Sequence, residues 1–231
     1  NTQRAPLSNA DVRAAIAALI DRDTVAAGYL AGHAEAARFP LSPRSALYPA
    51  ELASSLASPA LSAALEAAGV TQDRPRTLTV LVSETDSFKV SIAEYLSRTL
   101  TGSALTVTVR ALPWSDYLAA LQGGNFDLYL GEVRLTADWN ISALIASGGA
   151  LNYGGYADEQ CDALLSAFLA NETAQTASAL CRCLGQSAPI APIAFKTASV
   201  LTPEGLIDGL TPTVSSPFYR LSDWTVTFDK G

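Results

Sequence analysis

The segment from residue 77 to residue 134 constrains the fold most, because strand-like and helix-like patterns alternate along it. Its first run, TLTVLVS at 77–83, is β-branched and mostly apolar and lacks Gly and Pro, which is typical of a strand buried on both faces. Two further strand-like runs follow at 105–110 and 125–131. We therefore predict three strands, with the 77–83 strand at the centre.

Two helix-like segments separate these strands. The first opens at Asp86 and ends at Gly102, with apolar residues at helical spacing between them. The second begins at Pro113 and ends at Gly123. Parallel strands need such crossovers, which are right-handed by default, so the region predicts an open α/β sheet. Ligands bind beyond the carboxyl ends of the strands in such sheets, which singles out the loop EVRLTADWN at 132–140.

Composition excludes two classes of function. The formal net charge is −7 and the pI is about 4.7, whereas nucleic-acid binding needs clustered Lys and Arg, so we expect no nucleic-acid partner. The apolar runs fall short of the roughly 20 residues that cross a bilayer, so we predict no membrane span. With 231 residues, 49% of them hydrophobic, the chain can bury a sizeable core. It starts at Asn1 and has no methionine, so we expect a processed protein or a piece of a longer one.

Outside the central segment the pattern is mostly helical. We expect a capped amphipathic helix at 10–20 and a helix after Ser58 that has Pro59 at its first position. Between them, 33–49 should be an extended connection. Helices at 158–169 and 173–184 should form an antiparallel hairpin, followed by an edge strand at 189–195. The tail contains short β-like pieces, ASVLT and WTVTF.

The three cysteines lie in the predicted hairpin. Cys161 should face the helix that carries Cys181 and Cys183, so a disulfide from Cys161 to either of them is sterically reasonable and would fit an oxidising compartment. Three buried thiols in a reduced protein are an equally good interpretation. A zinc site from these cysteines and His33 is the weakest interpretation, because CRC is not a usual ligand spacing.

The order of these patches resembles one family, the extracytoplasmic solute-binding proteins of ABC importers, in the class that binds oligopeptides, dipeptides and nickel. The resemblance rests on DVRAAIAALIDRDTVAAGYLAG, SPALSAALEAAGV, YLAALQGGNFDLYL, ADWN, LNYGGYADEQCDALL, and APIAPIAF followed by DGLTPT. Each patch alone is weakly specific, but together they span most of the chain in the family's order.

The resemblance implies a fold and a role. It implies a periplasmic-binding-protein-like α/β lobe with an open mixed sheet, whose βαβαβ core is flanked by helices. Residues 1–231 would be a single ligand-binding lobe, the second lobe plus the C-terminal return segment of a two-lobe receptor, with the first lobe absent. Such a receptor binds a peptide or similar small solute between its lobes and presents it to ABC permease subunits in the membrane. It is extracytoplasmic, either periplasmic or a cell-surface lipoprotein, and we expect a monomer without cofactor or catalysis.

The resemblance also suggests ligand-binding residues in the loop at 132–140. Asp138 matches the aspartate that pairs with a peptide's α-amino group in relatives, although it could instead cap the following helix. Relatives often carry a tryptophan shortly before that aspartate, whereas here Trp139 follows it, which changes the shape of the pocket. Arg134 could meet a ligand carboxylate or pair with Glu132, and a solvated surface role is the stronger alternative.

Two further candidates lie in the glycine-rich stretch LNYGG. Tyr153, like Trp139, could line the cleft, although aromatic residues are more often core. Asn152 could contact ligand or satisfy the backbone of its own turn. We expect Trp114 and Tyr117 to serve packing.

Two other classes of function stay open. A small α/β hydrolase-like or metal-dependent enzyme could use Asp138 and Glu132 for acid-base or metal chemistry. Against it, the sequence shows only scattered carboxylates, with one histidine and no phosphate-binding glycine loop. An interaction domain without a small ligand is the third interpretation.

Overall fold

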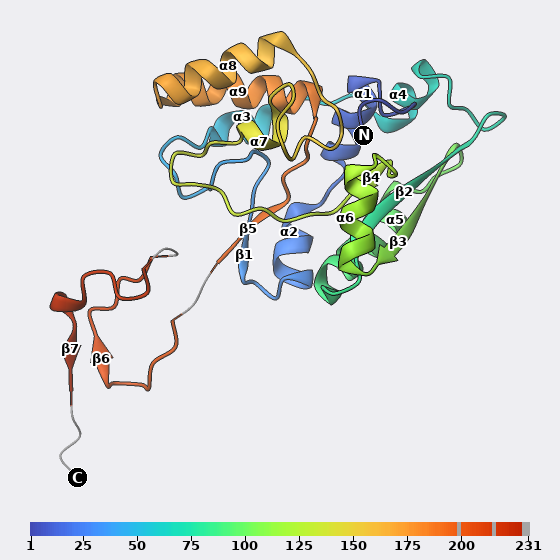
Figure 1. The fold of residues 1–231 in the computed structure, drawn as a ribbon. Helices are drawn as coiled ribbons and strands as arrows, with labels where there is room; N and C mark the ends of the chain where they lie inside the picture. The colour runs from blue at the N-terminus through green and yellow to red at the C-terminus, as the bar shows by residue number, and fades with distance from the viewer. Residues whose placement is uncertain (198–199, 214–215, 228–231) are drawn as a thin grey trace. The chain divides into compact units, whose positions relative to one another are not determined.

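The computed structural model describes residues 1–197, 200–213 and 216–227, and its contacts divide the chain into two units. Unit 1 is Asn1–Phe195 and unit 2 is Lys196–Gly231. Figure 1 shows the helices and the three-stranded sheet in unit 1. That 1–231 form one ligand-binding lobe stays a prediction. Within the described ranges, no helix is long and apolar enough to span a membrane.

A parallel sheet of three strands forms the centre of unit 1. Its strands are β2 (Arg76–Ser83), β3 (Leu105–Leu112) and β4 (Leu128–Tyr129), in the order β3-β2-β4. The prediction that the first strand is central is therefore confirmed.

Strand β4 is shorter than the predicted strand at 125–131. The carboxylate of Asp127 replaces a main-chain acceptor there, because its Oδ2 atom accepts the Thr79 N–H at 2.9 Å. Main-chain pairing with β2 therefore begins only at Leu128, opposite Val80, and the Leu130 N–H still reaches the Leu81 carbonyl at 2.9 Å.

Helices α5 (Ser87–Leu100) and α6 (Trp114–Gln122) cover opposite faces of the sheet. Successive side chains of β2 point to opposite faces of the sheet, which explains this arrangement. Leu78, Val80 and Val82 pack in the buried cluster that contains α5, while Leu81 packs in the cluster that contains α6. Helix α5 begins where predicted, because the Asp86 side chain accepts the Lys89 N–H at 3.1 Å. The βαβαβ core is thus present.

Four shorter elements complete the face of the sheet that α5 covers: α1 (Ala10–Ala18), α2 (Arg22–Thr24), the π-helix η1 (Val25–Tyr29) and α4 (Leu61–Ala67). Asn9 caps α1 by accepting the Asp11 N–H at 2.8 Å. Helix α4 begins after the N-cap Ala60, so the prediction that Pro59 occupies its first position was wrong.

The predicted helical hairpin is present as α8 (Glu159–Ala170) and α9 (Ala174–Ser187). Asp158 caps α8, and Thr173 caps α9 through a capping box with Thr176. The hairpin packs on α3 (Ala50–Ser55) and α7 (Ser142–Ile145) around a second buried cluster.

The connection at 33–49 is not wholly irregular. It contains β1 (Ala34–Ala36), which pairs with β5 (Ala194–Lys196). Strand β5 overlaps only the last two residues of the edge strand predicted at 189–195. This pairing joins segments about 160 residues apart, so no local pattern revealed it.

Unit 2 has little regular structure. It contains β6 (Ile207–Asp208), the 3₁₀ helix η2 (Leu221–Asp223) and β7 (Thr225–Val226), with β6 and β7 antiparallel. Two residues of the predicted piece ASVLT, 198 and 199, lie outside the described residues, as does the last residue of WTVTF. None of the described residues of unit 2 is buried.

Candidate functional site

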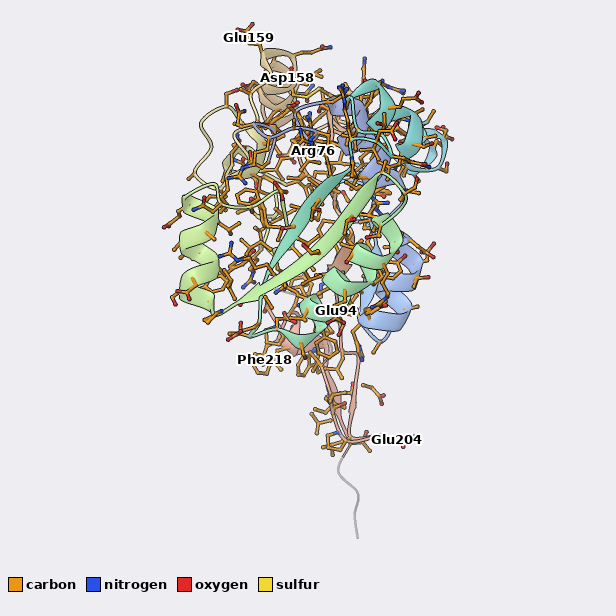
Figure 2. All side chains as sticks on the ribbon, turned by 90° about the vertical axis from the view of Figure 1, so that its right-hand side faces the viewer. Arg76, Glu94, Asp158, Glu159, Glu204 and Phe218 are labelled. Atoms are coloured by element: carbon orange, nitrogen blue, oxygen red, sulfur yellow. A yellow bond between two sulfur atoms is a disulfide. The ribbon has the colours of Figure 1, made fainter. Side chains whose placement is uncertain are left out.

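The carboxyl edge of the sheet is the candidate site. Strands β2, β3 and β4 end there, and Figure 2 shows Arg76 at the opposite, amino-terminal end of β2. Phe88, Trp114 and Val133 are three of the four large apolar side chains that the described part of unit 1 exposes, and each follows a different strand of the sheet. This edge therefore combines open loops with exposed apolar surface, as a binding face requires.

An ion-pair cluster ties two of these loops together. Lys89 Nζ lies 2.8 Å from Asp86 Oδ2 and 3.0 Å from Glu132 Oε2. Burial alone would lower the pKa of Lys89, but the hydrogen bonds to Asp86 and Glu132 outweigh it and raise that pKa. Glu132, which the sequence offered as a partner for Arg134, is thus engaged by Lys89, a residue that the sequence analysis did not select.

Asp138 is exposed and forms a local turn. Its Oδ1 atom accepts the Asn140 N–H at 3.3 Å, and hydrogen bonds from Thr136 and Asn140 hold its pKa below the usual value. The alternative role as a helix cap was wrong, because α7 begins after Ile141 and the Ser142 N–H instead binds Asn140 Oδ1 at 3.0 Å. An ionised carboxylate is therefore presented to solvent.

Trp139 has a backbone φ of 52°, in the left-handed region that a bulky residue rarely adopts. Its ring packs edge-on against Phe195, with centroids 5.8 Å apart. Arg134 is exposed, and no carboxylate is recorded within ion-pair distance of it in the described part of the chain. The structure thus holds Trp139 by packing and leaves Arg134 to solvent.

The glycine-rich loop orients its two candidates differently. The Asn152 side chain donates to the Ala146 and Tyr156 carbonyls at 3.0 and 2.7 Å and accepts the Tyr156 N–H at 3.0 Å, so its amide satisfies the turn. Tyr153 is partly exposed and packs edge-on against Tyr129, at 6.3 Å between ring centroids. Tyr153 therefore belongs with β4, whereas Trp139 packs in the cluster of the helical hairpin.

Trp114 departs from its expected packing role, because it is 57% exposed at the start of α6. Its ring stacks on Tyr117 at 5.6 Å, and Tyr117 itself is buried, which raises the pKa of its hydroxyl to about 12. Sequence reasoning missed Trp114 as a site residue. The available signal was its position two residues after the carboxyl end of a strand.

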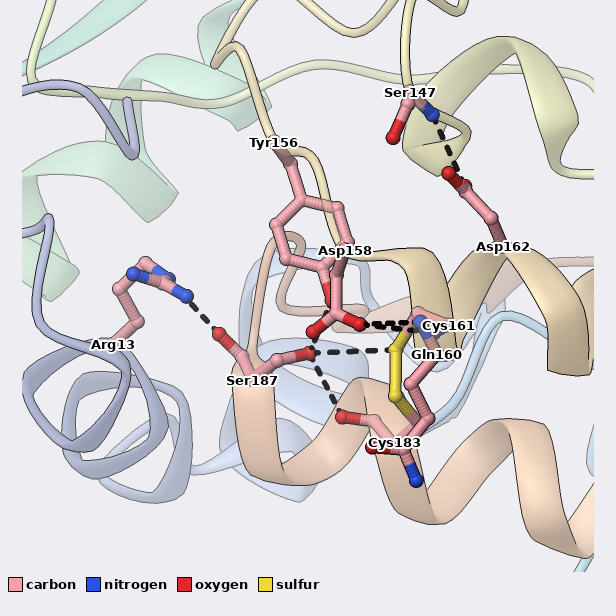
Figure 3. Close-up of a disulfide and its surroundings, with 9 residues drawn as sticks. All are labelled: Arg13, Ser147, Tyr156, Asp158, Gln160, Cys161, Asp162, Cys183 and Ser187. Atoms are coloured by element: carbon pink, nitrogen blue, oxygen red, sulfur yellow. Dashed lines mark hydrogen bonds between the residues drawn. A yellow bond between two sulfur atoms is a disulfide. The ribbon is translucent and has the colours of Figure 1, made fainter.

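The cysteines lie in the helical hairpin, apart from the loops of the sheet edge. Cys161 and Cys183 form a disulfide, and Cys181 is a buried free thiol whose pKa burial raises to about 12. Figure 3 shows Asp158 next to the disulfide, where it binds the N–H groups of Gln160 and Cys161. Asp158, Cys161 and Cys183 have suitable atoms for a metal, but both sulfurs are already bonded to one another.

Comparisons of sequence identify a family. Residues 1–150 match the family described as "Bacterial extracellular solute-binding proteins, family 5 Middle". No curated protein sequence matches the chain.

Solved structures share the fold. AppA from Clostridium difficile superposes with a TM-score of 0.77 at 15% identity, over 98% of this chain and 49% of that chain. The oligopeptide-binding protein AppA from Bacillus subtilis has a TM-score of 0.71 at 17% identity, over 99% of this chain and 49% of that chain. MppA, the murein tripeptide binding protein of Escherichia coli, has a TM-score of 0.66 at 21% identity, over 91% of this chain and 43% of that chain. The chain thus spans about half the length of these proteins. Because the family match covers more than half of its 231 residues, the chain belongs to the bacterial extracellular solute-binding proteins, family 5.

Proposed function

We propose that the chain is one lobe of the substrate-binding component of an ABC importer, and that it binds peptides at the carboxyl edge of β3-β2-β4. The family membership and the half-length matches to an oligopeptide-binding protein from Bacillus subtilis and a murein tripeptide binding protein support this proposal. The receptor would work outside the cytoplasm, as a periplasmic protein or a cell-surface lipoprotein, and would deliver ligand to ABC permease subunits as a monomer.

The observation that carries the peptide assignment is Asp138. Its carboxylate is exposed, ionised at neutral pH and located in the loop after β4. A peptide's α-ammonium group would make a charge-assisted hydrogen bond with it, which is stronger than a neutral one. The left-handed backbone of Trp139 supports a functional role for this turn, since such strain recurs at binding sites.

The other edge residues have supporting roles in this proposal. Trp114 and Tyr153 offer partly exposed aromatic rings to ligand side chains, and Arg134 offers an exposed guanidinium to a carboxylate. Trp139 positions the Asp138 turn through its packing on Phe195. Asn152 keeps the neighbouring loop in shape through its own hydrogen bonds.

Transport needs no bond chemistry in this scheme. A ligand held between two lobes binds the closed form of the receptor more tightly than the open form, and this difference in affinity stabilises the closed form. The permease then selects the closed form. Turnover of a peptide by the purified receptor would contradict this and favour the hydrolase-like alternative with Asp138 and Glu132 as acids.

The test is calorimetry on a receptor that contains this chain and its partner lobe. Asp138→Asn should weaken binding of a free-amine peptide about 10- to 100-fold, the value of a hydrogen bond to a charged group. Acetylating the peptide's amino group should weaken its binding to the wild type by as much as Asp138→Asn does. The Asp138→Asn variant should bind the acetylated and free-amine peptides with similar affinity.

The matched control is Asp73→Asn, which removes an exposed carboxylate before the amino end of β2 and should leave affinity unchanged. Equal affinities for free and acetylated peptides in the wild type would exclude Asp138 as the ammonium partner.

This lobe alone should bind peptides weakly, because a ligand in a one-sided site stays largely hydrated. Micromolar binding to the 231-residue chain by itself would show that the site is complete without a second lobe.

A further inference from the structure

A second site lies away from the sheet edge, between α1, α9 and the segments around Phe39 and Pro192. The structure has a cavity of about 20 Å³ there, lined by the side chains of Arg22, Arg38 and Ser58. A water molecule needs roughly 10–15 Å³, so the cavity admits one small group.

Among the described residues, Arg22 and Arg38 donate hydrogen bonds only to neutral acceptors. Arg22 donates through Nε to the Pro192 carbonyl at 2.8 Å and through Nη1 to the Ile20 carbonyl at 3.1 Å. Arg38 donates to the carbonyls of Ala53 and Leu56, at 2.8 and 2.9 Å. A guanidinium carries five N–H donors, and the described residues provide no recorded acceptor for Arg22 Nη2 or Arg38 Nε.

In the part of the chain that the structure describes, no carboxylate pairs with either of these two positive charges. Within the described ranges, neither arginine has an ion pair, whereas Arg44 pairs with Glu35 and Lys89 with Asp86. Acidic residues are not scarce, since the chain has 22 of them against 15 basic ones. Burial, and to a smaller extent the nearby charge of Arg38, lower the pKa of Arg22 to about 10.

The rest of the lining suits a weakly hydrated anion. Ser58 Oγ accepts from Arg38 Nη2 at 3.4 Å, so its own hydrogen is available for another acceptor. The other residues that line the cavity, among them Phe39, Leu184 and Ile190, are apolar or small. An apolar wall strengthens the attraction between an anion and the two arginines.

We propose that this cavity binds a single halide ion, held by Arg22, Arg38 and Ser58. A monatomic anion fits this small volume more closely than the larger tetrahedral oxyanions sulfate and phosphate do. The ion would join α2, which carries Arg22, to the end of α3, whose carbonyls Arg38 binds, so its role is to stabilise the lobe and it does not depend on the peptide site.

Crystals of the chain grown in bromide, measured at the bromine absorption edge, test the position directly. We expect an anomalous peak in the cavity in contact with both guanidinium groups. Crystals that diffract well and show no peak there would overturn the proposal.

The contribution of the bound halide to stability can be tested by measuring the unfolding equilibrium while chloride replaces sulfate at constant ionic strength. Above the dissociation constant, each tenfold rise in chloride should lower the unfolding equilibrium constant about tenfold. Arg22→Gln and Arg38→Gln should abolish this dependence, and the milder Ser58→Ala, which leaves the arginines in place, should weaken it. Arg44→Gln, which removes an exposed arginine that has its own carboxylate, should keep it. Equal stabilisation by chloride and by sulfate would contradict a specific halide site. So would a chloride dependence that remains in both arginine variants.

Discussion

At the scale of the residue, the buried thiol of Cys181 makes the stability of the protein sensitive to alkali. Its pKa is about 12 in the folded protein against an ordinary value of 9.0, because burial disfavours the thiolate. The unfolded chain therefore loses its proton first, so the stabilising contribution is complete below pH 9 and disappears as the pH rises towards 12. The free energy of unfolding falls by about 4 kcal/mol over the whole interval from pH 9 to 12, because the unfolded chain ionises and the folded one does not.

Cys181→Ala should accordingly flatten the alkaline decline of the free energy of unfolding. Near pH 8 the variant should be about 1 kcal/mol less stable, because it leaves a small space in the core. Urea unfolding at several pH values should show this deficit shrinking above pH 9. A constant difference at all pH values would mean that the thiol does not titrate differently in the two states.

The positive charge of Lys89 balances two carboxylates at the sheet edge and should therefore stabilise the fold. Lys89→Gln would leave the carboxylates of Asp86 and Glu132 facing one another without their shared cation. We expect a loss of about 1 kcal/mol in the free energy of unfolding at low salt, and a smaller loss at high salt. Arg110→Gln, an exposed basic residue near the end of β3, is the control and should change stability little. Equal losses in both variants would assign the effect to net charge alone.

At the scale of the element, the disulfide links α8 to α9. Its two cysteines are 22 residues apart, so the bond should stabilise the fold by roughly 3 kcal/mol by restricting the unfolded chain. The double variant Cys161→Ala/Cys183→Ala should lose about this much in chemical denaturation, and reduction of the wild type should match it. Alkylation of the unfolded, unreduced protein should modify one thiol, Cys181, and three modified thiols would refute the bridge.

Gly149 fixes the turn after α7 by its lack of a side chain. A Cβ atom there would lie 2.5 Å from the Ser142 carbonyl oxygen and 2.7 Å from that of Ala143, so backbone would have to move. Gly149→Ala should therefore lower stability by about 1–3 kcal/mol, as overpacked sites do. Gly102→Ala is the matched control, because a Cβ atom at Gly102 has no neighbour within 4 Å. Thermal unfolding should show a lower melting temperature for Gly149→Ala than for Gly102→Ala, and equal melting temperatures would contradict the steric argument.

At the scale of the whole molecule, the stability of the chain should reside in unit 1. All residues of the three buried clusters belong to unit 1, and no described residue of unit 2 is buried. A chain ending at Thr197, which keeps β5, should therefore unfold within a few degrees of the full chain. A cooperative transition that disappears on truncation would show that unit 1 needs the tail.

The sequence by itself determined the features that depend on local pattern. The alternation of strand and helix from 77 to 134 predicted the βαβαβ core and its central strand, and Asp86, Asp158 and Thr173 marked helix starts that the structure confirms. These features are readable because burial periodicity and capping act within a few residues of one another.

Only the tertiary structure decided the features that depend on distant partners. The Asp127 carboxylate shortened β4 by taking the N–H of Thr79, 48 residues away. Cys181 and Cys183 are about 200° apart around α9, so only one could face Cys161, and packing on α8 selected Cys183. At the candidate site, the sequence singled out the loop that carries Asp138 but not Lys89 or Trp114, since exposure and ion pairing arise only when three strand ends meet.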